Sequence, residues 1–146
     1  MSSPVVIEED EFEVARVGAL GGPSGAAAAF DRLEAGMQTL RGRKMYGVFY
    51  SGPPERYFAC LRLGSEGSDD LGFERALVPG GLYGRKTIRD WNSKIPELPV
   101  IFTDLQGDLV DAGFRIDPSR PSIEYYRRID ELIIMVPVLS AEAEMR

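Results

Sequence analysis

The fold is decided by Pro121-Ser122-Ile123-Glu124-Tyr125-Tyr126-Arg127-Arg128, which a turn at 129–130 joins to an almost wholly apolar stretch over 131–138. Aromatic and β-branched residues bounded by Pro and Asp are typical of a hairpin of two strands. Alternation along the first strand places Glu124 and Tyr126 on one face. If that face packs inward, the carboxylate must be paired, protonated or facing a charged ligand. We favour the ligand.

The composition limits the class of protein. A chain of 146 residues with net charge −6 fits one domain and disfavours direct binding to nucleic acid, which needs a basic face. We expect the basic clusters at 41–44 and 85–89 to be solvated. The single Cys60 excludes an internal disulfide and fits a reducing compartment, and the acidic residues 8–10 do not fit a signal peptide. A cytoplasmic protein that does not enter a membrane is therefore predicted.

Histidine is absent from the sequence. This removes the commonest metal ligand and the usual general base, so Ser-His triads and zinc hydrolases are excluded. No metal or cofactor is expected.

Periodicity predicts an α+β domain over residues 11–138, between a disordered acidic tail (1–10) and a C-terminal tail (139–146). Apolar stripes predict helices over 25–41, with Ser24 as the N-cap, and over 97–112, with Pro99 in the first turn. Strands are expected over 11–20, 45–51, 56–63, 73–78 and 82–88, before the terminal hairpin. The order strand, helix, strand, strand thus occurs in 11–63 and again in 81–138.

Three motifs carry a resemblance to a known family. They are the hairpin with Pro121, Ile123, Glu124, Tyr126 and Pro137-Val138; the run Gly52-Pro53-Pro54 before Arg56-Tyr57 and Ala59-Cys60; and the run Val78-Pro79-Gly80-Gly81 before Tyr83. In these motifs the chain resembles the GyrI-like, or AraC-type, effector-binding domains, whose first half is also matched by the strand, Gly-Pro turn and helix with Phe30 and Leu33. It departs from them at Phe58, where Asp is common, and at Arg89-Asp90-Trp91, where many members have His-x-Gly.

The resemblance implies duplicated β-α-β-β units that form a curved antiparallel sheet with two helices and a ligand cleft between the halves. It also implies sensing of structurally varied, drug-like molecules. A carboxylate among aromatic rings suits a lipophilic cation, since the rings attract positive charge face-on and the acid neutralises it. The candidate ligand-binding residues are Glu124, Tyr126, Trp91, Tyr46, Tyr50, Tyr57, Tyr83 and Phe58.

Simpler interpretations stand beside this one. Glu124 could pair with Arg127 and Arg128 at the surface, where such pairs contribute little. Each tyrosine could pack in the core with its hydroxyl bonded to the backbone. Trp91 could line the cleft or close the core, and Phe30 is expected in the core.

Three functions follow from these observations. The first is a stand-alone domain that binds a cationic, aromatic small molecule as a sensor or sequestering protein, because no helix-turn-helix fits beside the predicted elements. The second is a hydrolase of strained, cyclopropane-type electrophiles, with Glu124 as general base and Tyr57, Tyr83 or Tyr126 as donor. The third is a protein-binding inhibitor of a larger enzyme such as DNA gyrase. A protein partner or a homodimer is compatible with each.

Overall fold

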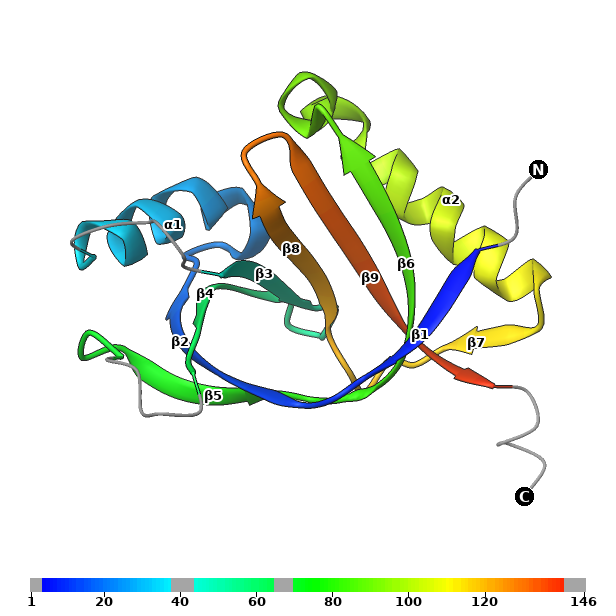
Figure 1. The fold of residues 1–146 in the computed structure, drawn as a ribbon, viewed down its shortest axis with the longest axis horizontal. Coiled ribbons are helices and arrows are strands. Elements are labelled where there is room, and N and C mark those ends of the chain that lie inside the picture. Colours follow the sequence, from blue (N-terminus) through cyan, green and yellow to red (C-terminus); the bar gives the residue numbers. More distant parts are fainter. Residues whose placement is uncertain (1–3, 38–43, 65–69, 141–146) are drawn as a thin grey trace.

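Alternating and apolar stretches form nine strands and two α-helices in the computed structural model, which describes residues 4–37, 44–64 and 70–140 (Figure 1). The strands are β1 (Val5–Glu9), β2 (Phe12–Gly18), β3 (Met45–Tyr50), β4 (Arg56–Arg62), β5 (Glu74–Val78), β6 (Gly81–Arg89), β7 (Phe114–Ile116), β8 (Ser122–Arg128) and β9 (Glu131–Ser140). The helices are α1 (Ala26–Ala35) and α2 (Leu98–Asp111), which follow the 3₁₀ segments η1 (Gly22–Gly25) and η2 (Trp91–Glu97).

The strands make a curled, antiparallel sheet in the order β1-β6-β9-β8-β3-β4-β2-β5, and β7 pairs with the end of β9. Two units of the same order build its centre: β2-α1-β3-β4 and β6-α2-β8-β9. Their inner strands β3 and β8 pair in register, so the junction of the halves lies at the middle of the sheet. The predicted α+β fold with a curved sheet and two helices is confirmed.

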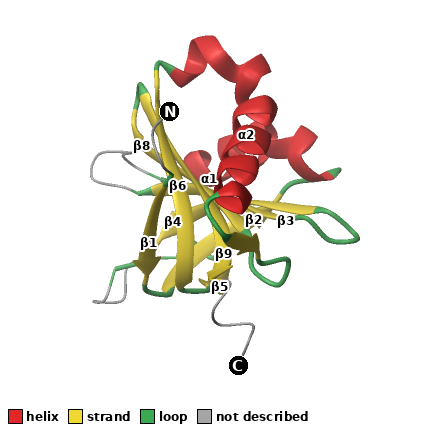
Figure 2. Ribbon diagram, turned by 90° about the vertical axis from the view of Figure 1, so that its right-hand side faces the viewer, coloured by secondary structure: helices red, strands yellow, loops and turns green. Residues whose placement is uncertain are grey.

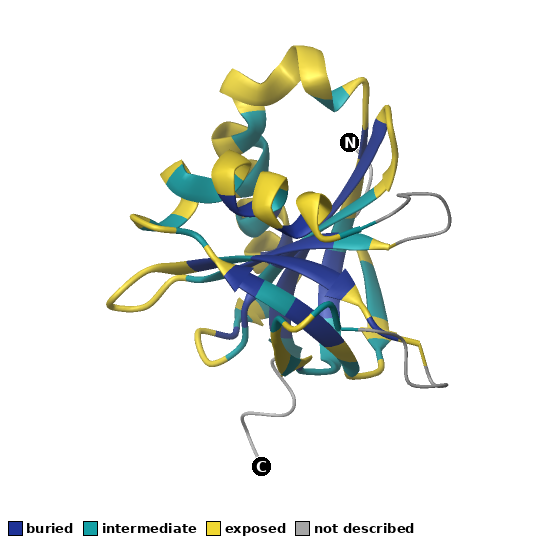
Figure 3. Ribbon diagram, turned by 90° about the vertical axis from the view of Figure 1, so that its left-hand side faces the viewer, coloured by how far each residue is buried: buried dark blue, intermediate teal, exposed yellow. Residues whose placement is uncertain are grey.

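The two faces of the sheet bury different cores. One face, which we call the helix face, carries both helices (Figure 2), with α1 beside the half of β2, β3 and β4 and α2 beside the half of β6 and β9 (Figure 1), and each helix covers its own apolar cluster. The opposite face, which we call the inner face, lies inside the curl and carries one cluster that joins side chains of β2, β3, β4, β5, β6, β8 and β9. Figure 3 shows that the buried residues concentrate in the strands, while the helices are largely exposed. Both faces of the central strands are therefore packed.

Each helix is anchored by a short apolar stripe. In α1 the buried residues are Ala29 and Leu33, and in α2 they are Leu105 and Leu109. Gly84 of β6 lets α2 approach the sheet closely, because a Cβ there would collide with the Leu109 side chain. The burial of these side chains fixes the position of each helix over its own half of the sheet.

The helix ends differ from the prediction. Ser24 is not an N-cap: it lies inside η1, and its hydroxyl donates to the Gly21 carbonyl at 3.1 Å, as local hydrogen bonding of serine favours. The α-helix α1 begins at Ala26 and ends at Ala35, whereas the predicted helix continues to 41, and residues 38–41 lie outside the described residues. The bounds of α2 agree with the prediction within one residue, and Pro99 lies in its first turn.

Three segments predicted without regular structure form strands. Residues 5–9 are the edge strand β1 rather than a disordered tail, because pairing with β6 satisfies their backbone groups. Residues 114–116 form β7, and β9 extends through Ser140 opposite Phe114, so the predicted C-terminal tail begins later than 139. Within the described residues, no helix has the length and apolar character needed to cross a membrane.

Candidate functional site

Glu124 lies at the junction of the two halves. It occupies the middle of β8, opposite Gly47 of β3 and Ile134 of β9, and its side chain points to the helix face. Its Oε1 accepts hydrogen bonds from two tyrosines, the Tyr57 hydroxyl and the Tyr126 hydroxyl, the latter at 3.0 Å. The acid is half-buried and is held by two neutral donors.

Gly47 makes this arrangement possible. Tyr57 lies on β4 and Glu124 on β8, on the two sides of β3, so their side chains meet across the intervening strand. A Cβ at Gly47 would collide with both the tyrosine hydroxyl and the carboxylate. The missing side chain therefore opens the space in which they bond.

Four aromatic rings surround this contact on the helix face. The Phe30 ring of α1 lies 5.3 Å from the Tyr126 ring and 6.4 Å from the Tyr57 ring, both edge-on. The Trp91 ring of η2 lies 5.3 Å from Tyr126. The indole Nε1 of Trp91 is buried, and no hydrogen-bond partner for it lies among the described residues. Through these ring contacts, α1 and η2 both pack against Tyr126, which lies on the same strand as the acid.

A cavity of about 410 Å³ opens beside Glu124, and we call it the junction cavity. Its walls come from η1, the ends of β3 and β4, α2, the segment 116–120 and β8. This volume is within the range of small-molecule sites. The apolar side chains of its lining are Pro23, Phe49, Leu98, Pro99, Phe102, Ile116, Pro118 and Pro137.

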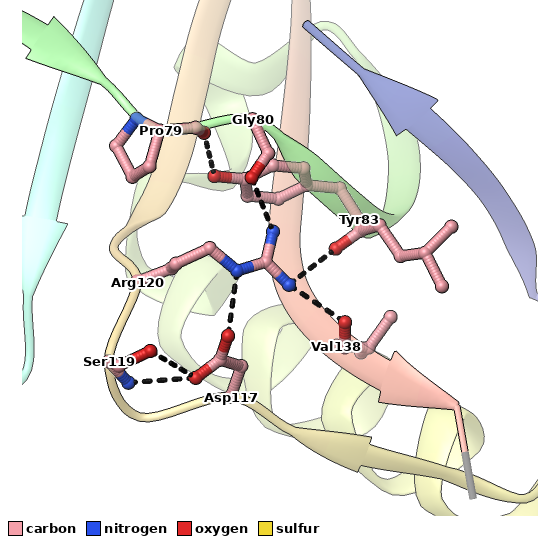
Figure 4. A network of polar contacts seen from close by, with 8 residues as sticks. Pro79, Gly80, Tyr83, Asp117, Ser119, Arg120 and Val138 are labelled. Carbon is pink, nitrogen blue, oxygen red and sulfur yellow. Dashed lines mark hydrogen bonds and ion pairs between the residues drawn. The ribbon is translucent and has the colours of Figure 1, made fainter. Parts of the chain in front are cut away.

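The basic residue of this lining is already engaged. Arg120 donates to the Asp117 carboxylate at 2.7 Å and to the carbonyls of Val138, Leu82 and Gly80 at 2.8, 3.1 and 3.4 Å (Figure 4). A guanidinium with that many acceptors gains nothing by turning to a second acid.

The arginines that follow Glu124 in the sequence do not pair with it either. Arg127 and Arg128 approach the buried Glu131 at 3.5 and 3.7 Å. Among residues 4–37, 44–64 and 70–140, Glu124 has no basic partner, so the surface pairing considered from the sequence does not occur.

The environment shifts the acidities of these groups. Burial raises the pKa of Glu124 above its ordinary value, although the hydrogen bonds from Tyr57 and Tyr126 act in the opposite direction. Burial and the neighbouring carboxylate raise the pKa of both tyrosines, which therefore stay protonated. Burial acts to raise the pKa of Asp117, but hydrogen bonds from Arg120 and Ser119 outweigh it and lower that pKa. The titrating group of the cavity is thus Glu124.

The predicted site residues fall on both faces of the sheet. Glu124 and Tyr57 line the junction cavity, Tyr126 bonds to Glu124, and Trp91 contacts Tyr126. The expectation that all the rings form one cage around Glu124 is wrong, because strand alternation points the others away from it. The residues on the inner face are Tyr46, Tyr50, Phe58 and Tyr83.

The sequence interpretation missed other lining residues. Phe49 lies opposite Tyr57 in the pairing of β3 with β4, and it is two residues from Gly47 on β3. Strand alternation therefore predicts that Phe49 points to the same face as Gly47. Phe102 lies in the predicted second helix, but periodicity alone does not show that this part of α2 faces a cavity. Arg120 lies in a segment expected to be a loop, where no pattern signals it. No group of three His, Cys, Asp or Glu side chains suited to a metal ion occurs within the described parts of the chain.

The fold and this cavity define the class: an α+β domain whose two β-α-β-β halves meet at a half-buried acid.

No family model and no curated protein matches the chain. Among solved structures, SAV2435 bound to tetraphenylphosphonium is similar, with 12% identity over 97% of each chain and a TM-score of 0.61. A hydrolase from Listeria innocua has 14% identity over 94% of this chain and 92% of its own, with a TM-score of 0.61. An integron cassette protein from the mobile metagenome of Vibrio cholerae has 16% identity over 94% and 97%, with a TM-score of 0.57. At these identities the likeness establishes a shared fold.

Proposed function

We propose that the chain is a domain of the GyrI-like effector-binding type, which binds lipophilic, aromatic cations in the junction cavity as a sensor or sequestering protein. One observation carries the proposal: Glu124 borders an apolar cavity and is held there by two neutral hydroxyls, without a basic partner among the described residues. A neutral guest would leave that acid uncompensated, whereas a cation removes the cost of its ionisation.

The lining supplies the rest of the affinity. Phe49, Tyr57 and Phe102 offer rings, each worth about 0.5–2 kcal/mol to a cation placed over its face. The attraction between Glu124 and a cation is stronger here than in water because the surroundings are less polarisable. The charges of Asp117 and Arg120 cancel in their ion pair, so the cavity carries the single negative charge of Glu124. The structure of SAV2435 with tetraphenylphosphonium supports this, since that protein shares the fold and holds an aromatic cation.

Calorimetric titration with tetraphenylphosphonium tests the proposal. Tetraphenylborate, which has the same shape and the opposite charge, is the matched probe. The two ions are titrated separately, because together they precipitate as a salt, and we expect the phosphonium to bind and the borate not to bind. Glu124→Gln removes the charge and keeps the shape, and should weaken phosphonium binding at least about tenfold, or about 1.4 kcal/mol.

The control variant is Glu131→Gln, which removes a buried acid of the neighbouring strand that pairs with Arg127 and Arg128. It should leave phosphonium binding unchanged. Equal phosphonium binding by wild type and Glu124→Gln, or binding of the borate to wild type as tight as that of the phosphonium, would refute the proposed role of the charge.

A second candidate function is hydrolysis of a strained, cyclopropane-bearing electrophile conjugated to a carbonyl. The observation that favours it is a carboxylate of raised pKa at the cavity, with the Tyr57 hydroxyl in the cavity lining and the Tyr126 hydroxyl bonded to the same acid. Glu124 would accept a proton from water as the water oxygen bonds to a ring carbon. The ring C–C bond breaks, its electron pair moves to the carbonyl oxygen, and a hydroxyl of Tyr57 or Tyr126 turned toward that oxygen stabilises the charge until it is protonated.

This candidate predicts turnover. Incubation with a cyclopropyl ketone alkylating agent should give a product heavier by one water in mass spectrometry, at a rate that falls in Glu124→Gln and in Tyr57→Phe. A rate equal to that without protein excludes the hydrolase and leaves the binding function in place. The hydrolase from Listeria innocua supports testing it, because it shares this fold.

A further inference from the structure

A second cavity, of about 380 Å³, lies on the inner face of the sheet, and we call it the inner cavity. It shares β3 and β8 with the junction cavity, but it is lined by the alternate residues of those strands. Tyr46, Ile123 and Tyr125 point into it, whereas their neighbours Gly47 and Glu124 belong to the helix face. The sheet separates the two cavities.

The floor of the inner cavity is aromatic. The rings of Tyr46 and Tyr125 stack at 4.6 Å with 14° between their planes, and Phe12 lies 4.8 Å from Tyr46. Tyr83 is fully buried, and its hydroxyl donates a hydrogen bond to the Pro79 carbonyl at 2.7 Å. An aromatic guest can pack against the edges and outer surfaces of these rings.

The charged groups of the cavity are mostly basic. Lys44, Arg62, Arg85 and Arg127 line it, opposed by Glu9. This contrasts with the chain as a whole, whose net charge is −6. A local excess of positive charge in an acidic protein concentrates anions at that cavity.

These basic side chains differ in whether an acidic partner already neutralises them. Arg127 also approaches Glu131 at 3.5 Å, so its charge is partly offset. Arg62 is positioned by a 3.3 Å hydrogen bond to the Tyr46 hydroxyl and by stacking over Phe12, neither of which neutralises it. Within the part of the chain that the structure describes, Lys44 and Arg85 have no ion pair. Three charges are therefore available to a guest.

We propose that the inner cavity is a second ligand site, which takes an aromatic anion: a flat ring bearing a carboxylate, sulfonate or phosphate. The ring lies against Tyr46 and Tyr125, and the anionic group reaches Arg62 and Arg85. Guanidinium groups suit such oxyanions because they donate paired, charge-assisted hydrogen bonds. The site is independent of the junction cavity, since the opposite charge selects its guest and the opposite face of β8 lines it.

Calorimetric titration with 1-naphthoate tests the proposal, with 1-naphthylmethanol as the neutral analogue. We expect naphthoate to bind at least about tenfold more tightly than the alcohol, and the difference to shrink in high salt as the exposed charges are screened. Arg85→Gln should weaken naphthoate binding about fivefold or more. Lys86→Gln is the matched control, because it removes the same charge one residue along β6 and lies outside the cavity.

A further variant guards against loss of structure. Arg62→Gln could disturb the fold, because Arg62 also packs on the Phe12 ring. Lys44→Gln removes an exposed charge of the same cavity, and the circular dichroism spectra of the two variants are compared to detect any loss of structure. Both should weaken naphthoate binding. The proposal is overturned if naphthoate does not bind, if the alcohol binds equally, if the variants bind as wild type does, or if Glu124→Gln changes naphthoate binding as much as Arg85→Gln does. The last result would place the anion in the junction cavity.

Discussion

The hydroxyl of Tyr57 and the carboxylate of Glu124 meet across strand β3, above Gly47, although neither residue lies on a strand that pairs with the other's. This contact joins the two β-α-β-β halves through side chains, in addition to the backbone pairing of β3 with β8. It also fixes the acid at the wall of the junction cavity.

Gly47→Ala should break this contact. The added methyl group collides with both partners, and overpacking of this kind costs about 1–3 kcal/mol of unfolding free energy. Urea unfolding measures the loss, and binding of tetraphenylphosphonium should weaken together with it. Gly107→Ala is the control: nothing lies near a Cβ there, and alanine in the exposed middle of α2 should stabilise by about 0.5–1 kcal/mol. If Gly47→Ala changed neither the unfolding free energy nor phosphonium binding, the contact between Tyr57 and Glu124 would not depend on the space above Gly47.

Glu124→Gln should make the stability of the domain less dependent on pH. The folded-state pKa of Glu124 is raised above the ordinary 4.5, so the folded state holds this proton more tightly than the unfolded state does. Ionisation of Glu124 therefore lowers stability as pH rises from about the unfolded pKa through the folded pKa. The free energy of unfolding of wild type minus that of the variant, measured by urea at successive pH values, should fall over this interval and then level off. A difference that rises with pH would mean that the ionised acid is stabilised in the fold.

Tyr57→Phe should move the titration of Glu124. The hydroxyl lowers the pKa of the acid by a hydrogen bond, so its removal should raise that pKa further and shift the pH midpoint of phosphonium binding upward. Tyr50→Phe removes a hydroxyl from the inner face and should leave the midpoint where it is. Identical midpoints in all three proteins would show that Tyr57 does not tune the acid.

Arg120→Ala should be strongly destabilising. The side chain is largely buried, and its loss removes the cationic partner of the buried Asp117, whose Oδ1 keeps its hydrogen bonds from Ser119, and takes one donor from the carbonyls of Leu82 and Val138. Removal of one partner of such a pair costs about 3–5 kcal/mol. Thermal or urea unfolding checks this, with Arg75→Ala as the control, whose exposed pairs with Glu13 and Asp70 should matter little. Comparable losses in the two variants would contradict the structural role of Arg120.

The sequence predicted the acid better than its surroundings. Alternation in β8 correctly put Glu124 and Tyr126 on one face, because a strand's period is independent of its neighbours. The same rule, applied strand by strand, cannot say which face of one strand adjoins which face of another. That depends on the order β8-β3-β4 and on the register, which place Tyr57 with Glu124 and Tyr46 on the other side.

The strand that the sequence did not predict depends on residues far away in the chain. Charged residues in 5–9 resemble a tail, but edge pairing with β6 depends on a partner more than 70 residues away in the sequence. The helix α2 was predicted closely because a long apolar stripe and the first-turn position of Pro99 both lie within the segment itself. Long-range pairing is what sequence periodicity does not contain.

The central claim is that the charge of Glu124 selects the guest, and the affinity of wild type for tetraphenylphosphonium as a function of pH tests it most directly. The other titratable groups of the junction cavity keep their charge, since Tyr57 has a raised pKa and Asp117 a lowered one. Affinity should therefore rise by up to about tenfold per pH unit below the raised pKa of Glu124 and level off above it. Glu124→Gln should bind weakly and equally at every pH. An affinity of wild type that does not change with pH, or that changes in the same way in Glu124→Gln, would contradict the account.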